Sequence, residues 1–301
     1  MNSYKKDIPP HPEFYIAKFT KNPDMPYLLF IHGGPGFNCG TIEYLIENNN
    51  LFELLDYNII LYDQRNCGRS KKHYENVLHQ DNMNDLHEII EHLIDSLKIK
   101  IHGLVGHSYG AKLLCDYYNK FHSTIPGIFV STATSILTPR LNNLMIDLSY
   151  LKKSNPHQFN ETLQEMDNLD LKKIWGISEK LTYLFQENKD RPYLYWANLD
   201  CFEMITAIQK RINLPMNTNT FVSVRKDLYS NESNFSVDIN NLSISYLWIN
   251  GFHDLIINGS EGILFNKKNI VTFFKSSHYP HIEENNRFCE LINKFIQNVG
   301  N

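Results

Sequence analysis

The sequence lacks several features that would point to a special class of protein. Its five cysteines are an odd number at wide spacing and form no CxxC pair. This argues against a zinc site or a disulfide framework and favours a reducing compartment. No stretch approaches the roughly 20 apolar residues that a membrane span needs. The first residues, MNSYKKDIPPHPEF, contain lysines without a following apolar run, so we expect no signal peptide and a cytoplasmic location.

A strong charge of either sign is also missing. The formal net charge is −4, and no block of like charge stands out. We therefore expect neither nucleic acid nor a membrane as a partner, and the oligomeric state stays open. The chain does have 301 residues, of which 42% are hydrophobic and 13% aromatic. That is enough to bury a large core.

Short apolar runs alternate with helical patterns in the first part of the chain. The expected strands are 27–32, 57–63, 101–106 and 127–133. Apolar residues recur at steps of three and four in 83–97 and again after Ser108, the spacing of one helix face. Strands that alternate with helices predict a mainly parallel sheet with helices on both faces.

The pattern changes between about residues 135 and 240, which are aromatic-rich and helical in texture. Strands return at 243–251 and 269–277, and 282–298 reads as a closing helix. The simplest interpretation is an α/β core interrupted by a helical cap. The predicted core covers 1–134 and 241–301, and the predicted cap covers 135–240.

Ser108 lies between two glycines in the stretch HGLVGHSYGAK. This Gly-x-Ser-x-Gly motif follows an apolar strand and opens an amphipathic helix, the arrangement that a nucleophile elbow requires. In so tight a turn, side chains at Gly106 and Gly110 would collide with their surroundings. The alternative is a plain strand-to-helix turn. A phosphate loop is a poor match, because Ala111 stands where a Walker motif needs Lys.

A serine hydroxyl needs a base, and the chain has 13 histidines. His278, in FFKSSHYPHIEE, follows a predicted strand at the sheet edge where catalytic groups collect. His281 is the competing candidate. Asp254, in LWINGFHDLIING, would orient the base, although it could also be a helix N-cap or turn residue. His253 beside it is interpreted as a turn residue. The order serine, aspartate, histidine is that of an α/β-hydrolase.

The stretch FIHGGPGFNCG follows a strand and is rich in glycine. Gly34, Gly36 and Gly40 miss the Gly-x-Gly-x-x-Gly spacing of a dinucleotide fingerprint by one residue. We interpret the stretch as an oxyanion loop, with the backbone N–H groups of Gly34 and Tyr109 as the predicted donors. No cofactor is expected.

A possible metal motif, DLHEIIEHL, also fails on spacing. His87 and His92 are five residues apart, which places them about 140° apart around a helix. They cannot share a metal ion, so no metal site is predicted.

Three stretches taken together resemble the prolyl aminopeptidase (proline iminopeptidase) family of α/β-hydrolases. They are HGGPG, DQRNCGRS and GHSYG, where the family has HGGPG, DQRGxGxS and GxSxG. The stretch SHYPHIEE is similar to the GHxPxxEE stretch that carries the catalytic histidine in many α/β-hydrolases. The resemblance covers about 1–133 and 241–301. It implies an α/β-hydrolase fold, a helical cap and a short peptide substrate with a free N-terminal residue such as proline.

The sequence departs from the family pattern at four positions near these motifs. Asn66 stands where Gly is usual, and His107 and Tyr109 flank the serine where Gly and Trp are common. Ser277 replaces the Gly before the histidine. The three expected catalytic residues are unaffected, but the substrate preference could differ.

Acidic cap residues hold the substrate's amino terminus in the family. Asp200 and Glu203, in YWANLDCFEM, are the candidates here. We prefer Glu203, as a partly buried carboxylate among aromatic residues, although it could be an ordinary helix carboxylate. Asp63 and Arg65 are expected to stabilise the HGGPG loop through charge-assisted hydrogen bonds.

The sequence therefore predicts a cofactor-free serine hydrolase with Ser108, His278 and Asp254 as its catalytic residues. By resemblance it is an aminopeptidase that releases an N-terminal residue, such as proline, from short peptides. The first alternative is an esterase, lipase or lactonase acting on a small ester. The second is a hydrolase-like binding protein that has lost turnover.

Overall fold

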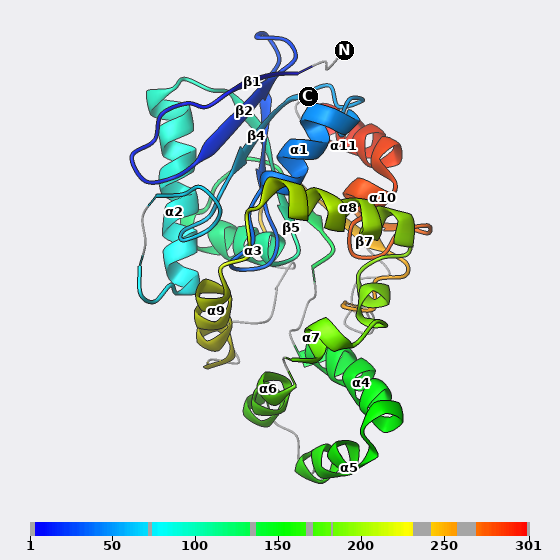
Figure 1. The fold of residues 1–301 in the computed structure, drawn as a ribbon. Helices are drawn as coiled ribbons and strands as arrows, with labels where there is room; N and C mark the ends of the chain where they lie inside the picture. The colour runs from blue at the N-terminus through cyan, green and yellow to red at the C-terminus, as the bar shows by residue number, and fades with distance from the viewer. Residues whose placement is uncertain are drawn as a thin grey trace.

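The protein, described here by a computed structural model, is built around a mainly parallel sheet (Figure 1). The described residues are 4–71, 74–132, 137–166, 171–181, 183–230, 242–257 and 269–299. The sheet order is β1-β2-β4-β3-β5-β6-β7-β8. β2 pairs antiparallel with β1 and β4, and the other neighbours are parallel. The strands are Lys5–Asp7, Ile16–Thr20, Tyr27–Ile31, Asn58–Tyr62, Ile101–His107, Gly127–Val130, Tyr246–Gly251 and Ile270–Phe273.

The prediction of a mainly parallel sheet is confirmed, and all six expected strands are present from β3 to β8. The antiparallel strands β1 and β2 were not expected. β1 is a short polar edge strand, KKD, with no apolar run to indicate it. Helix α1, Gly40–Asn49, was also not expected. The boundaries predicted for the cap, at 134/135 and 240/241, lie outside the described residues, so that division stays a prediction.

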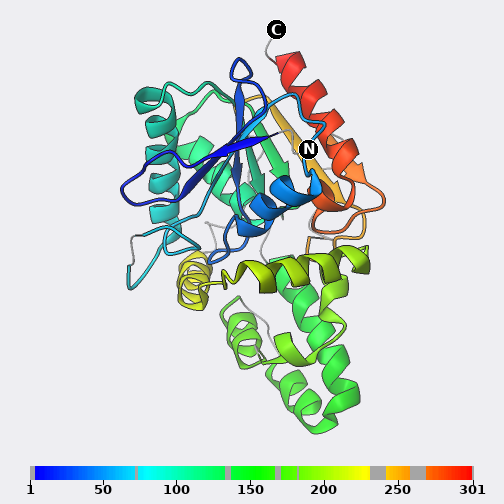
Figure 2. The ribbon, with the colours of Figure 1, turned by 45° about the horizontal axis from the view of Figure 1, so that its top comes forward.

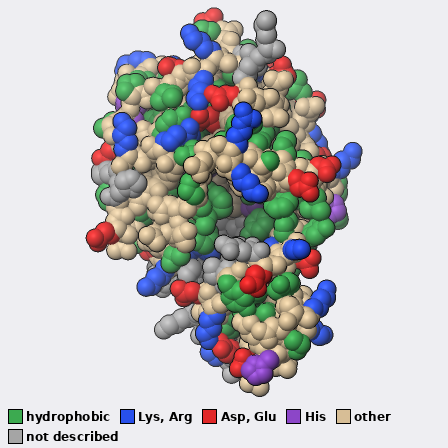
Figure 3. Space-filling model, in the orientation of Figure 1, with side chains coloured by type: hydrophobic (Ala, Val, Ile, Leu, Met, Phe, Trp, Pro, Cys, Tyr) green, Lys and Arg blue, Asp and Glu red, His purple; other side chains and the backbone are tan. Residues whose placement is uncertain are grey.

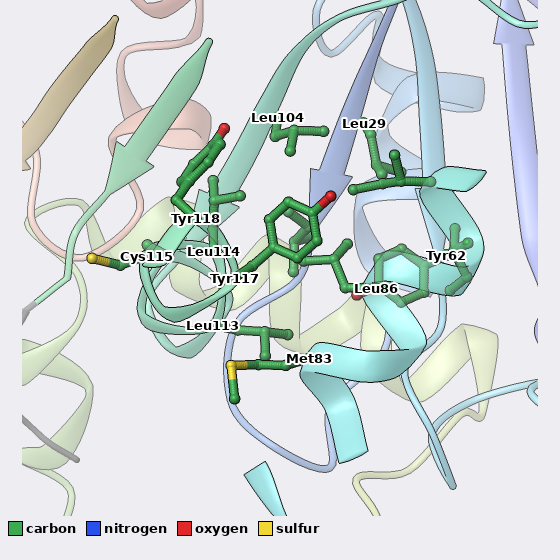
Figure 4. Close-up of a cluster of buried hydrophobic side chains, with 14 of the residues drawn as sticks. Leu29, Tyr62, Met83, Leu86, Leu104, Leu113, Leu114, Cys115, Tyr117 and Tyr118 are labelled. Atoms are coloured by element: carbon green, nitrogen blue, oxygen red, sulfur yellow. The ribbon is translucent and has the colours of Figure 1, made fainter. Parts of the chain in front are cut away.

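Two helices cover one face of the sheet, because each has an apolar stripe at helical spacing. They are α2 (His79–Glu91) and α3 (Tyr109–Phe121). α2 continues into a short π-helix, η1 (His92–Ser96). Figure 4 shows their side chains meeting those of the central strands. This cluster includes Leu29, Tyr62, Met83, Leu86, Leu104, Leu113, Leu114, Cys115, Tyr117 and Tyr118.

Helices α1 and α11, Asn285–Val299, cover the opposite face. α11 follows the short helix α10, Pro280–Glu283. The buried face of α11 consists of Phe288, Cys289, Ile292 and Ile296. The sheet is therefore covered on both faces, and the carboxyl ends of its parallel strands are left to form a site.

The described part of the chain between β6 and β7 is mostly helical, and some of its helices pack on the core while others project from it (Figure 2). α8 packs on α1, and α9 packs on α2, whereas α4, α5 and α6 project away from the sheet. α4 and α6 share a small hydrophobic cluster of their own with α7. The elements are α4 Leu137–Ser154, α5 Pro156–Glu165, α6 Leu171–Lys180, α7 Leu184–Glu187, η2 Arg191–Leu194, α8 Leu199–Ile212 and α9 Thr218–Ser230.

Among the helices in the described ranges, none is both long enough and apolar enough to cross a membrane.

Candidate active site

Ser108 lies in the sharp turn between β5 and α3. Its backbone has φ 53° and ψ −117°, a conformation that is unfavourable for a residue with a Cβ and is found at functional sites. A Cβ at Gly106 would lie 2.6 Å from the Cα of Ala111, and one at Gly110 would lie 2.3 Å from the carbonyl oxygen of Ile31. Both positions therefore require glycine, as the sequence predicted.

The side chains of Ser108, His278 and Asp254 form a continuous chain of hydrogen bonds. Nε2 of His278 lies 2.9 Å from Oγ of Ser108. Nδ1 of His278 lies 2.8 Å from Oδ2 of Asp254. Because a carboxylate only accepts, Nδ1 carries the proton and Nε2 can accept the hydroxyl proton of Ser108. The three residues come from loops after β5, β7 and β8, which end at the same edge of the sheet.

Asp254 is fixed on its other side as well. It follows β7, and its side chain is buried, with 1% exposure. Oδ1 accepts hydrogen bonds from the backbone N–H groups of Ile256 at 3.0 Å and Ile257 at 3.4 Å. One carboxylate oxygen thus organises the turn and the other contacts His278, so both interpretations of Asp254 describe its contacts.

Two further histidines pack against His278. The rings of His107 and His278 are 5.0 Å apart, and those of His107 and His281 are 4.7 Å apart. Nε2 of His107 donates to the carbonyl oxygen of His278 at 2.8 Å. Burial lowers the pKa of His107 well below its usual value and lowers that of His281 to about 3. His281 is therefore a buried neutral neighbour, and it is His278 that contacts Ser108.

The HGGPG loop lies directly against the turn that carries Ser108. A Cβ at Gly33 would lie 3.1 Å from the Cβ of Ser108. Gly34 has φ +54°, and the ring of Phe37 occupies the place of its missing Cβ. Tyr109 is the first residue of α3, where N–H groups have no partner within the helix. The two predicted donors therefore belong to segments that flank Ser108, and their catalytic role stays a prediction.

The residues of the DQR stretch contact different segments of the core. Asp63 is fully buried and accepts hydrogen bonds from the backbone N–H groups of Cys39 and Arg69, both at 2.8 Å. These two hydrogen bonds reach Cys39 and Arg69 and not the HGGPG loop (32–36) that Asp63 was expected to stabilise. Arg65 instead contacts Asp85 of α2. Gln64, which was not singled out, donates from its side chain to the carbonyl oxygen of His32 at 2.9 Å.

Two departures from the family pattern have a clear structural basis. Asn66 has φ 58°, a left-handed conformation that Gly adopts freely and Asn tolerates. Its side chain hydrogen-bonds to both backbone groups of Tyr74. Ser277 is fully buried, and its Oγ donates to the carbonyl oxygen of His253 at 3.0 Å. Both replacements for glycine therefore make contacts that glycine could not.

The candidate carboxylates of α8 do not lie in the buried part of the site. Glu203 and Asp200 are exposed, whereas Ile205 and Ile208 of the same helix are buried. Glu203 is therefore not the partly buried carboxylate that was expected, and its role in amine binding stays a prediction.

A hollow bordered by hydrophobic side chains lies between the sheet-containing body and the projecting helices (Figure 3). A cavity of about 780 Å³ adjoins Asp254 and is lined by Tyr193, Trp196, Phe252, Lys275 and others. Ser108 is not among its lining residues. Within the described ranges, no group of three His, Cys, Asp or Glu side chains could hold a metal ion.

Curated proteins of known name are similar to this chain in sequence. A proline iminopeptidase of Saccharolobus solfataricus is 25% identical over 288 residues, 90% of this chain and 85% of that protein. A proline iminopeptidase of Lactobacillus acidophilus is 29% identical over 175 residues, but this match covers only 49% of the chain and 55% of that protein. The predicted resemblance to the proline iminopeptidases is thus confirmed.

Solved structures show the same fold at low sequence identity. A proline iminopeptidase-related protein from Thermus thermophilus has a TM-score of 0.65 at 16% identity and covers 98% of each chain. An esterase from Exiguobacterium antarcticum has a TM-score of 0.60 at 16% identity and covers 94% of this chain and 95% of that one. The family described as "alpha/beta hydrolase fold" matches residues 26–285. The chain therefore belongs to the α/β-hydrolase fold family.

Proposed function

We propose that the protein is a serine hydrolase in which Ser108 is the nucleophile. The observation that carries this proposal is the hydrogen-bond chain from Ser108 through His278 to Asp254 on a strained turn. A lone serine in a strand-to-helix turn would need no such partner. The chain provides the base that a serine hydroxyl requires and the acid that orients the base.

In the proposed reaction, Oγ of Ser108 attacks a carbonyl carbon while Nε2 of His278 takes its proton. The N–H groups of Gly34 and Tyr109 stabilise the negative charge that develops on the carbonyl oxygen. His278 then gives the proton to the leaving group, and an acyl-enzyme forms. Water activated by His278 releases the acyl group and restores Ser108.

We further propose an N-terminal aminoacyl group, such as prolyl, as the acyl group that is transferred. The similarity to curated proline iminopeptidases, above all the match over 90% of this chain, supports this substrate class. Such a substrate carries an ammonium group, which a carboxylate side chain close to Ser108 would bind. The exposed Glu203 is the candidate from the sequence.

The alternative is an esterase or lactonase with the same catalytic residues. The exposure of Asp200 and Glu203 favours it, because an ester without a free amine needs no carboxylate to bind it.

Hydrolysis of proline 7-amido-4-methylcoumarin and p-nitrophenyl butyrate would separate the two functions, with Ser108→Ala as the blank. An aminopeptidase should hydrolyse the prolyl amide and lose that activity when the substrate is N-acetylated. Hydrolysis of the ester alone would contradict the aminopeptidase and leave the serine hydrolase. If Ser108→Ala hydrolysed either substrate as fast as the wild type, the nucleophile assignment would be wrong.

A further inference from the structure

The loop that carries His278 contacts the helical segment as well as the core. The backbone N–H of His278 donates to the carbonyl oxygen of Tyr195 at 3.0 Å. The rings of Tyr195 and His278 meet edge to face at 5.6 Å. The next residues, Trp196 and Tyr279, stack at 4.2 Å with an angle of 12°. The residues from Tyr195 to Asn198 form the non-helical connection between η2 and α8, so this connection packs directly on His278.

One carboxylate joins the two segments. Oε1 of Glu283 accepts hydrogen bonds from the backbone N–H groups of Ala197 at 2.8 Å and Asn198 at 2.9 Å. Its Oε2 accepts from the backbone N–H of Ser277 at 2.7 Å. Ser277 directly precedes His278, and Asn198 is the N-cap of α8. Glu283 therefore contacts the start of the helix with one oxygen and the His278 loop with the other.

The chemistry of this contact is specific to a carboxylate. The backbone partners given above are all N–H donors, and only a carboxylate accepts with both oxygens. A glutamine could accept on one side only, and its NH₂ group would face an N–H donor on the other. Partial burial raises the pKa of Glu283, while the hydrogen bonds from the backbone act in the opposite direction. The positive end of the α8 dipole also favours a negative charge here.

We propose that Glu283 is a positioning residue that couples the start of α8 to His278. Its carboxylate fixes the position of Ser277, and thereby keeps the imidazole of His278 within hydrogen-bond distance of Ser108. This holds while residues 195–198 stay packed on the His278 loop. A shift of this connection would move the base away from the nucleophile. This inference rests on the proposed function of Ser108 and His278.

The test compares Glu283→Gln with Glu290→Gln, which removes an exposed carboxylate of α11. We would measure kcat and KM on whichever of the two substrates the wild type hydrolyses. The labelling rate of Ser108 by a fluorophosphonate and the thermal unfolding temperature would be measured alongside. We expect kcat of Glu283→Gln to fall by about 10-fold to 100-fold with little change in KM. Labelling should slow in parallel, and Glu290→Gln should match the wild type.

A folded Glu283→Gln with wild-type kcat, or with a change in KM alone, would overturn the inference. If Glu283→Gln does not fold, Glu283→Asp retains the charge but is one methylene too short to reach both sides, so the same loss of kcat is expected. The two proposals can fail separately. An inactive wild type that does not label would contradict the proposed function, whereas an active wild type with an unaffected Glu283→Gln would contradict only the role of Glu283.

Discussion

His107, the residue before Ser108, donates a hydrogen bond from Nε2 to the carbonyl oxygen of His278 at 2.8 Å. The two segments are thus joined twice, because the neighbouring Oγ of Ser108 contacts the ring of His278 at 2.9 Å. The turn that carries Ser108 and the His278 loop are therefore held together by a hydrogen bond to the backbone as well as by the contact between the Ser108 and His278 side chains.

Replacing His107 should test this contact. His107→Phe keeps a ring but leaves the buried carbonyl oxygen of His278 without its donor, which costs about 1–3 kcal/mol of stability. We expect kcat to fall by about 10-fold or more, because the His278 loop is no longer held in place and the imidazole shifts away from Ser108. His107→Gln, whose amide can still donate, should retain more activity. Equal activity of the two variants would show that only the volume of the ring matters.

Asp254→Asn should be far more damaging than its small change in shape suggests. The amide oxygen can replace Oδ1 in accepting from the N–H groups of Ile256 and Ile257. The NH₂ group then faces Nδ1 of His278, which must become an acceptor and place its proton on Nε2. His278 can no longer accept from Ser108, and kcat should fall by about 10³-fold to 10⁴-fold. Retention of a tenth of wild-type kcat would contradict the assignment of Asp254.

His281 should make the stability of the protein depend on pH. Burial, with a smaller contribution from His278, lowers its pKa from 6.5 to about 3. Between these values the unfolded chain binds a proton that the folded protein does not. The free energy of unfolding is therefore unaffected by His281 above its pKa in the unfolded chain. It decreases as the pH falls from that value toward the pKa of His281 in the folded protein. The slope approaches about 1.4 kcal/mol per pH unit for one proton.

Urea unfolding of the wild type and His281→Leu between about pH 7 and pH 5 measures this effect. Nδ1 of His281 is buried without a hydrogen-bond partner in the part of the chain that the structure describes, so leucine should be accepted. The free energy of unfolding should fall less steeply with acid in the variant. Parallel slopes would mean that His281 titrates alike in the folded and unfolded states.

Alanine substitutions at two glycines compare a crowded position, in the turn that carries Ser108, with an open one in α6. Gly110→Ala would place its Cβ 2.3 Å from the carbonyl oxygen of Ile31, so the turn should be displaced and the protein inactive or unfolded. Gly176, within α6, has nothing within 4 Å of its Cβ position among the described atoms. Gly176→Ala should stabilise the helix by about 1 kcal/mol. Thermal unfolding of both variants checks the contrast, and similar effects would contradict it.

The contacts around Ser108 that the sequence indicated are those that local geometry determines. The glycines around Ser108 are needed by a turn of a few residues, so the motif in its strand-to-helix context was sufficient. The choice between His278 and His281 depended on their positions relative to a predicted strand. Their separation of three residues leaves one facing Ser108 and the other buried beside His107.

The parts that the sequence did not predict depend on contacts between distant segments. Glu283 contacts Ala197, 86 residues away, and no local pattern indicates such a pairing. Glu203 is different, because the chain contained a usable signal. Ile205 and Ile208 lie on the buried face of α8, and a residue two positions before Ile205 lies about 160° around the helix from it. The apolar face of α8 thus predicts an exposed Glu203.

Covalent labelling of the folded protein by a fluorophosphonate, with the modified peptide identified by mass spectrometry, tests the role of Ser108 most directly. We expect one adduct on Ser108 in the wild type, none in Ser108→Ala, and slow labelling in Asp254→Asn. An unlabelled wild type, or equal labelling of Ser108→Ala at another residue, would contradict the claim that Ser108 is the nucleophile.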